Sequence, residues 1–170
     1  MRKLSTVLKW TLLVFVLVTA GVFGWGWYHV FGPMPKTLDT VRSMTELPVP
    51  DSATIVGMRT ERFLRPNIDA RLRMPPDDFE RWREELPFDL TRDPDTVNLA
   101  RDWLRWPGRK DARPPDWWRP DDLQDPLAAF AAYPTSGAPP DDPLPRHHIR
   151  LLAEEQPDGM VDVYLYDLVD

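Results

Sequence analysis

Cysteine is absent from this chain of 170 residues. Its absence excludes disulfide bonds, thiolate metal ligands, a thiol nucleophile and a lipid-modified cysteine. A domain of this chain that lies outside the cytoplasm must therefore be stable without covalent cross-links. The residues from Glu46 onward are numerous enough to bury a modest core.

Recognisable enzyme motifs are absent as well. The sequence has no G-x-S-x-G elbow, no phosphate-binding glycine loop, no H-E-x-x-H pair and no dinucleotide fingerprint. His147 and His148 are adjacent, so on a strand they point to opposite faces and cannot chelate one ion. We expect both to be exposed polar residues that enter a strand. Acidic pairs are abundant, but most follow a proline or begin a predicted element, where capping explains them. We predict a protein that is not an enzyme and uses no cofactor or metal.

Acidic residues are missing from the first 36 residues, whose charged residues are all basic: Arg2, Lys3, Lys9 and Lys36. The whole chain carries a formal net charge of −6, so the rest of it is distinctly acidic. Binding to nucleic acid requires a basic patch that displaces counterions from phosphates. The charge distribution therefore argues against nucleic acid as a partner.

Charged residues of either sign are missing between Lys9 and Lys36. The run at 10–31 reads WTLLVFVLVTAGVFGWGWYHVF, and as a helix its stretch from Trp10 to Val30 spans about 31 Å, the thickness of a bilayer core. Aromatic residues at both ends of the run and basic residues before it are typical of a membrane span with a cytoplasmic N-terminus.

We therefore predict a basic cytoplasmic segment at 1–9, a transmembrane helix at 10–31 in the lipid bilayer, and a body outside the cytoplasmic (inner) membrane. The alternative is a signal peptide cleaved after Val18-Thr19-Ala20, which would release a secreted protein.

Proline is frequent after this run, with 20 prolines in the chain. Residues 32–51 form a Pro-rich connector, in which a short helix over Leu38–Met44 fits the sequence. The remainder, 52–170, is predicted to be one α+β domain. A small antiparallel sheet of two hairpins carries helices packed on one face.

Alternating apolar residues locate the two hairpins. Residues 53–64 and 67–74 form the first, because Ile68, Ala70, Leu72 and Met74 alternate with charged residues. The second is the C-terminal stretch around the Pro157-Asp158-Gly159 turn. Its last strand is apolar on both faces, so it is either central and covered on both sides or offers one face to a partner.

Capping and periodicity predict three helices in the domain. The first has a capping box of Asp77 and Glu80 and buries a stripe of Phe79, Trp82 and Leu86. The second has Asp93 as its cap, Pro94 at its first position and an apolar stripe of Leu99, Trp103 and Trp106. The third is a short helix at 125–133. It lies inside a Pro/Trp-rich loop at 107–146, which is otherwise irregular.

Trp117 and Trp118 lie in that loop, in the stretch RPPDWWRP, and no periodic pattern accounts for them. Three interpretations remain open. They anchor the loop to the core, they form an exposed platform for a sugar ring or a proline-rich chain, or they enter the outer leaflet of the membrane. We expect the first, with a partner site as the alternative. The candidate binding residues are Trp117, Trp118, Arg113, Asp116, Arg119, Tyr164 and Tyr166.

These observations predict a single-pass, membrane-anchored, extracytoplasmic binding module. Its partner would be a membrane or envelope protein, or an envelope polymer. Two alternatives remain. One is an envelope glycan- or peptide-acting enzyme that uses acidic residues near Trp117 and Trp118. The other is a structural subunit of a membrane complex, whose helix carries the function.

Overall fold

The computed structural model describes residues 2–32, 34–61, 66–105, 114–135 and 146–169, and in its first helix it describes the side chains from Trp10 to Gly26. The chain divides into two compact units, Met1–Met34 and Pro35–Asp170. The division falls within the predicted Pro-rich connector.

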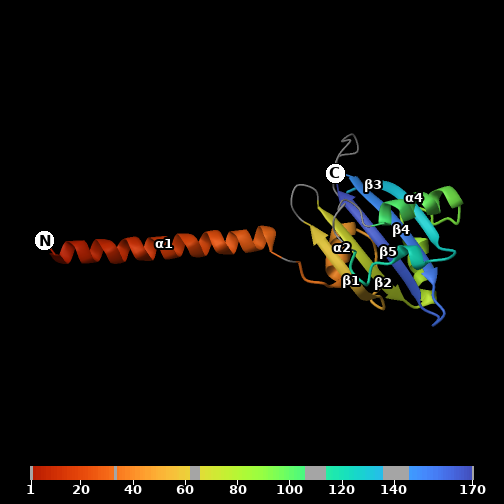
Figure 1. Ribbon diagram of the computed structural model, residues 1–170, viewed down its shortest axis with the longest axis horizontal. Coiled ribbons are helices and arrows are strands. Elements are labelled where there is room, and N and C mark those ends of the chain that lie inside the picture. Colours follow the sequence, from red (N-terminus) through yellow and green to blue (C-terminus); the bar gives the residue numbers. More distant parts are fainter. Residues whose placement is uncertain (1, 33, 62–65, 106–113, 136–145, 170) are drawn as a thin grey trace. The chain divides into compact units, whose positions relative to one another are not determined.

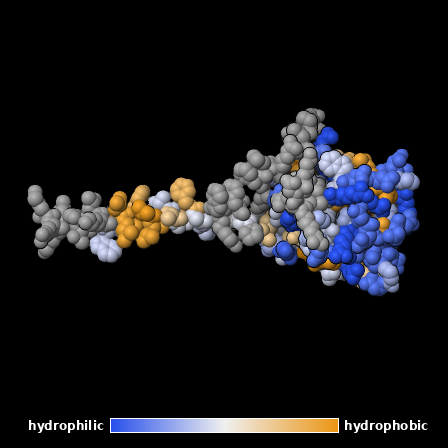
Figure 2. Space-filling view, viewed as in Figure 1, coloured by the Kyte–Doolittle hydropathy of each residue, from blue (hydrophilic) through white to orange (hydrophobic). Residues whose placement is uncertain are grey.

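The first unit contains one helix, α1, at Arg2–Phe31, which runs without interruption for 30 residues (Figure 1). Its described apolar side chains are exposed and form the hydrophobic band in Figure 2. The segment 10–31, which was expected to be a transmembrane helix, is therefore helical. However, among the described residues no helix has both the length and the apolar character of a membrane span.

The second unit is an α+β domain around one five-stranded antiparallel sheet (Figure 1). The spatial order of the strands is β1-β2-β5-β4-β3. Their bounds are β1 Thr54–Glu61, β2 Asn67–Met74, β3 Leu127–Pro134, β4 Arg146–Glu155 and β5 Val161–Val169. The predicted α+β class and antiparallel sheet are confirmed.

Both predicted hairpins are present, as the pairs β1–β2 and β4–β5. β5 also pairs with β2, with Ala70 opposite Leu165, and this pairing joins the hairpins into one sheet. β5 is therefore the central strand. Its residues from Val161 to Asp167 are all buried, which explains why it is apolar on both faces.

The helix predicted at 125–133 is wrong, because this segment forms strand β3. The segment is rich in alanine, which favours helices locally. In the fold it pairs along its whole length with β4, with Ala129 opposite Leu151. That ladder satisfies the backbone groups on one side of the strand through residues that are distant in sequence. Tertiary pairing thus overrides local propensity.

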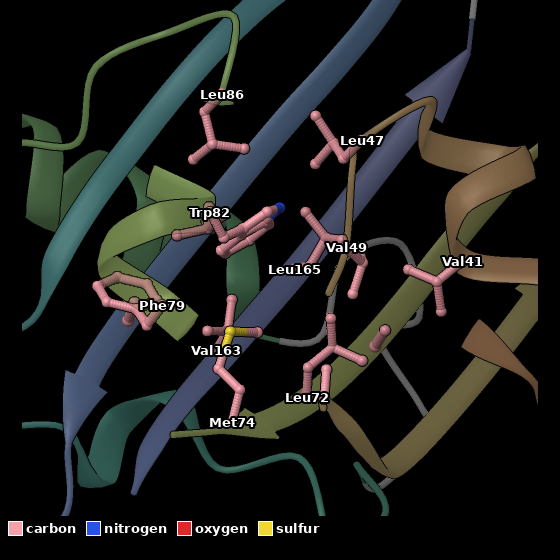
Figure 3. Packing of buried hydrophobic residues seen from close by; sticks show 14 of the residues in the cluster. Val41, Leu47, Val49, Leu72, Met74, Phe79, Trp82, Leu86, Val163 and Leu165 are labelled. Atoms are coloured by element: carbon pink, nitrogen blue, oxygen red, sulfur yellow. The ribbon is translucent and has the colours of Figure 1, made fainter. Parts of the chain in front are cut away.

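The prediction that the helices pack on one face of the sheet is also wrong, because they cover both faces. Helices α2 (Leu38–Thr45) and α3 (Pro76–Glu85) contribute to one buried cluster, and helix α4 (Pro94–Leu104) contributes to another on the opposite face. In the first cluster Trp82 of α3 and Val41 of α2 lie over Leu72 and Val163 of the sheet (Figure 3). A sheet whose central strand is apolar on both faces needs both layers to keep water away.

The helix ends follow the sequence in part. Asp93 caps α4 by accepting a hydrogen bond from the Thr96 backbone N–H, and Pro94 is its first residue, as predicted. The predicted capping box of α3 is wrong, because its N-cap is Pro75 and makes no side-chain hydrogen bond. Asp78 instead forms an ion pair with Arg81 one turn later.

The apolar stripe of α3 is buried as predicted, whereas that of α4 is wrong. Ala100 and Leu104 are the buried residues of α4, while Leu99 and Trp103 are exposed. Trp106 lies outside the described residues. The buried face of α4 is therefore narrow and lined by smaller side chains, whereas Leu99 and Trp103 keep much of their surface in solvent.

Candidate functional site

Trp118 anchors the Pro-rich segment to the core, as the first interpretation predicted. Its side chain is 2 % exposed. Its indole Nε1 donates a hydrogen bond of 2.7 Å to the backbone oxygen of Leu104, at the end of α4. Its ring meets Tyr164 of β5 edge-on, with the centroids 5.5 Å apart. Trp118 therefore joins α4 to the sheet and presents no ring face to a ligand.

Trp117 is half-buried and lies against the backbone of β1 at Gly57. A Cβ atom built on Gly57 would lie 2.0 Å from Cδ2 of Trp117, so only glycine leaves room for the ring there. The backbone oxygen of Trp117 accepts a hydrogen bond of 3.2 Å from Arg71 of β2. Trp117 meets Trp118 edge-on at 5.4 Å. Both tryptophans are thus packed, although Trp117 keeps part of its surface in solvent.

The other predicted site residues are not gathered around an open platform. Tyr164 and Tyr166 of β5 are buried. Asp116 and Arg119 are exposed, and Arg119 Nε donates to the backbone oxygen of Asp116 within the same turn. Arg113 lies outside the described residues.

The buried carboxylate near the two tryptophans, that of Asp162, is engaged in ion pairs. Asp162 of β5 is 1 % exposed and accepts hydrogen bonds from Arg71 at 2.7 Å and from Arg73 at 2.8 Å. Burial by itself raises the pKa of Asp162, but the two guanidinium groups outweigh it and lower the pKa below the ordinary value. Arg71 links this carboxylate to Trp117. The arrangement fastens the loop that holds the tryptophans to the sheet.

The expectation that His147 and His148 are both exposed is wrong for His147. His147 is 2 % exposed, and its Nδ1 lies 2.6 Å from Oδ2 of Asp167 on the neighbouring strand. Tyr133 stacks on the imidazole at 4.9 Å, and Glu46 lies 3.8 Å from Nε2. His148 points to the other face and is partly exposed. No local pattern indicates this pair, because Asp167 lies twenty residues from His147 in the chain.

Burial lowers the pKa of His147, but the hydrogen bond to Asp167 and the charges of Asp167 and Glu46 more than offset this effect. The pKa of His147 is therefore raised above its ordinary value. Tyr133 also donates a hydrogen bond to the backbone oxygen of Thr45. This cluster fastens the C-terminal end of α2 to the sheet. Among the residues that the structure describes, no group of three or more His, Asp or Glu side chains forms a metal site.

A small pocket of about 290 Å³ opens between α3 and the end of the β4–β5 hairpin. Its floor is apolar, with Phe79, Leu127 and Val161, and its rim is mainly acidic. One rim carboxylate, Glu154, accepts hydrogen bonds from the backbone N–H groups of Gln124 and Asp125, so it has a structural role. The volume of the pocket lies near the lower limit for ligand-binding pockets.

The most unusual surface of the domain is formed by Leu99 and Trp103 of α4 and Phe130 of β3, which we call the aromatic surface. Their exposed fractions are 44 %, 45 % and 41 %. Leu99 and Trp103 lie one turn apart on the same side of α4, and the rings of Trp103 and Phe130 are 6.4 Å apart. Within the described part of the second unit, the remaining large apolar side chain of comparable exposure is Val56 of β1.

Arg150 of β4 forms the base of the aromatic surface. Its guanidinium carbon lies 4.5 Å from the ring centre of Trp103, 4.9 Å from that of Phe130 and 5.3 Å from that of Tyr166. Arg150 is 5 % exposed, and its Nη1 donates to the backbone oxygen of His148. A cation is attracted to the face of an aromatic ring, so Arg150 stabilises the three rings around it. The aromatic surface is therefore exposed and has a buried cationic base.

Sequence reasoning assigned Trp103 to the core and did not single out Phe130 or Arg150. The pattern of α4 could have indicated Trp103, because Ala100 and Leu104 form a row of smaller residues beside the row of Leu99 and Trp103. No pattern in the sequence indicates Phe130 or Arg150. The chain matches no known family model, no curated protein and no solved structure. The proposals below therefore depend on its geometry and sequence.

Proposed function

We propose that this protein is a non-catalytic binding module that contacts a protein partner through the aromatic surface. The observation that carries the proposal is the clustering of exposed apolar residues. Three of the four large apolar side chains exposed in the described part of the second unit lie together, over the buried guanidinium group of Arg150. Exposed apolar residues are normally scattered, and a contiguous group marks a contact site.

The composition of the aromatic surface supports a protein partner. Tryptophan and arginine are enriched among the residues that dominate binding energy, and they act best where their conformations are already fixed. The surrounding domain is acidic and well solvated, and hydrophilic residues cover much of the face seen in Figure 2. The aromatic surface contrasts with these surroundings, as the apolar centre of an interface contrasts with its rim.

The chemistry around Trp117 and Trp118 favours binding over catalysis. A typical glycan-cleaving enzyme needs a carboxylic acid that is protonated near neutral pH beside a second, free carboxylate. Asp162, which Arg71 links to Trp117, instead has a lowered pKa and two arginine partners. The enzyme alternative has no feature of comparable weight in its favour.

The proposal includes a tether at the outer face of the cytoplasmic membrane. Its support is the uncharged run at 10–31, preceded by basic residues. The finding that no described helix qualifies as a span weighs against it. Two experiments test the tether. After extraction of cell membranes with alkaline carbonate, a tethered protein stays in the membrane pellet. When protease is added to spheroplasts, a tag at the C-terminus is removed if the domain lies outside the membrane. Release into the supernatant, or a tag that survives protease, rejects this part of the proposal.

The binding role is tested with Phe130→Glu in the full-length protein. This change places a charge in the aromatic surface, at a position that is already 41 % exposed. Val56→Glu is the matched control, because Val56 is an exposed apolar strand residue, at 42 %, on the opposite edge strand. After cross-linking in cells, we expect a specific protein that co-purifies with the parent chain and with Val56→Glu to be lost from Phe130→Glu.

Equal loss from both variants, or retention by both at normal abundance, would contradict the binding role of the aromatic surface. Trp117→Ala provides a further comparison at the position first suggested by the sequence. If Trp117 only packs the loop, this variant keeps the co-purifying protein whenever it still folds.

A further inference from the structure

The small pocket between α3 and the end of the β4–β5 hairpin, which we call the strand-end pocket, takes no part in the binding proposed above. The register of the sheet builds its floor. Leu127 at the start of β3 lies opposite Ala153 of β4, and Glu155 at the end of β4 lies opposite Val161 at the start of β5. Residues two apart on a strand point to the same face, so Ala153 and Glu155 both face the pocket. Phe79 of α3 completes the floor.

The strand-end pocket combines an apolar floor with a negative rim. The apolar residues of the floor are buried members of the core, so packing holds them in place. The rim carries four carboxylates, those of Glu80, Asp125, Glu154 and Glu155, against the one guanidinium group of Arg92. A ligand that matches both features has an aliphatic stem and a cationic end.

Three of the four carboxylates can accept a ligand, because the fourth has the structural role described above. No ion pair among the described residues engages Glu155. Glu80 pairs with Arg83 at 3.3 Å, and Asp125 pairs with Arg92 at 3.2 Å, and all four side chains are exposed. Exposed ion pairs contribute little to stability, so a ligand replaces them at small cost.

We infer that the strand-end pocket binds the side chain of a lysine from a protein partner. Lysine buries its aliphatic stem along apolar surface and keeps its ammonium group where charge is stabilised. The three carboxylates come from three parts of the fold, namely α3, the segment before β3 and the end of β4. A compact ammonium group has three donors that reach separate acceptors, whereas the planar guanidinium group of arginine suits a single carboxylate better.

The size of the pocket favours a side chain over a free amine. Its volume of about 290 Å³ is near the lower limit for pockets that enclose a whole ligand. The affinity of a small free ligand is limited by its number of atoms, whereas a side chain belongs to a partner that makes further contacts outside the pocket. The net charge of −6 on the chain also attracts a basic partner.

This contact goes beyond the proposed binding role and does not depend on it. The floor of the strand-end pocket belongs to the buried cluster to which α2 and α3 contribute. The aromatic surface lies on the face of the sheet that α4 covers. Failure of one proposal therefore leaves the other standing.

Titration of the full-length protein with short capped peptides tests the inference. The probe is one lysine flanked by glycines. The comparison peptide has norleucine in its place, which keeps the aliphatic stem and removes the ammonium group. The signals are the methyl resonances of Leu127 and Val161, which line the pocket. We expect saturable shifts in the millimolar range with the lysine peptide and no saturable shift with the norleucine peptide.

Variants of the rim show whether the shifts report the pocket. Glu155→Gln and Glu80→Gln each remove one charge from an exposed position, and each should weaken binding of the lysine peptide by about twofold to fivefold. Glu85→Gln is the matched control, because Glu85 is an exposed residue of α3 that does not line the pocket. This variant has the same net charge as the other two and should bind the lysine peptide as the parent protein does.

Four results would overturn the inference. The norleucine peptide binds as tightly as the lysine peptide, which would show apolar contact alone. Glu85→Gln weakens binding as much as Glu155→Gln, which would show attraction to the acidic domain as a whole. A peptide with arginine in place of lysine binds more tightly than the lysine peptide. Butylammonium binds more tightly than the lysine peptide, which would make a free amine the occupant.

Discussion

The contact between Trp117 and Gly57 allows a sharp test of the role of the paired tryptophans. Alanine at position 57 would place its Cβ 2.0 Å from Cδ2 and 2.3 Å from Cγ of Trp117. These atoms belong to the base of the indole and cannot swing aside while the backbone of the loop is held. Trp118 and the hydrogen bond from Arg71 hold that backbone. Gly57→Ala must therefore displace Trp117 or the strand.

The size of the effect follows from two opposed terms. Forcing extra atoms into a packed site costs about 1–3 kcal/mol. Gly57 has no positive φ, so without the clash the same change would stabilise the fold by about 0.4–1 kcal/mol through the unfolded chain. We expect Gly57→Ala to destabilise the parent protein and to be neutral or stabilising when Trp117 is also alanine. The gain through the unfolded chain cancels between the two backgrounds, so the coupling between the two changes equals the clash alone, about 1–3 kcal/mol.

Urea unfolding of the parent, the two single variants and the double variant measures this coupling. Far-ultraviolet circular dichroism is the appropriate signal, because tryptophan fluorescence changes with the substitution itself. Gly159→Ala is the control. Gly159 has φ +76° and open space around it, so alanine there destabilises through the backbone alone and should not couple to Trp117→Ala. Coupling near zero for Gly57 would refute the packing of Trp117 on β1.

Three further predictions concern buried polar groups. Asp162→Asn should destabilise the fold by about 3 kcal/mol, because it leaves two arginine residues without their carboxylate, and urea unfolding measures the loss. The pKa of Asp162 is lowered in the fold, so the stability that its carboxylate contributes is present above the unfolded pKa of about 3.9 and is lost as the pH falls through the folded pKa. The Asp162→Asn variant should therefore lose less stability than the parent protein on acidification. The pKa of His147 is raised, so the stability that the protonated imidazole contributes is complete below about pH 6.5 and is lost as the pH rises through the folded pKa. His147→Gln should remove this decline in stability. A pH profile of stability that is the same in parent and variant would contradict the ion pair with Asp167. Trp118→Phe should cost about 1–3 kcal/mol, because the backbone oxygen of Leu104 loses its indole donor, and a neutral result would show that this bond is not formed in solution.

Local patterns were sufficient for much of the fold. Strand alternation located β2, and the proline and aspartate at the start of α4 located that helix. The same patterns failed where distant contacts decided the outcome. The alanine-rich segment 127–134 forms strand β3 because its backbone pairs with β4. Leu99 and Trp103 are exposed because Ala100 and Leu104 occupy the face of α4 that packs on the sheet.

The candidate site could be anticipated less well than the fold. The two adjacent tryptophans drew attention in the sequence, and the interpretation of Trp118 as an anchor agrees with its burial. The aromatic surface depends on residues from α4, β3 and β4, and no spacing in the sequence relates them. The pair of His147 and Asp167 was missed for the same reason, since neighbouring strands bring them together.

The sequence by itself determined the absence of covalent cross-links, the uncharged N-terminal run, the acidic body and the apolar character of both faces of β5. These properties follow from composition and from periods of two or of 3.6 residues, which each segment carries alone. Tertiary structure alone decided which face each helix covers and which of the described tryptophans are buried. Those outcomes depend on how segments far apart in the chain compete for the same surface, and that competition is resolved only when the sheet assembles.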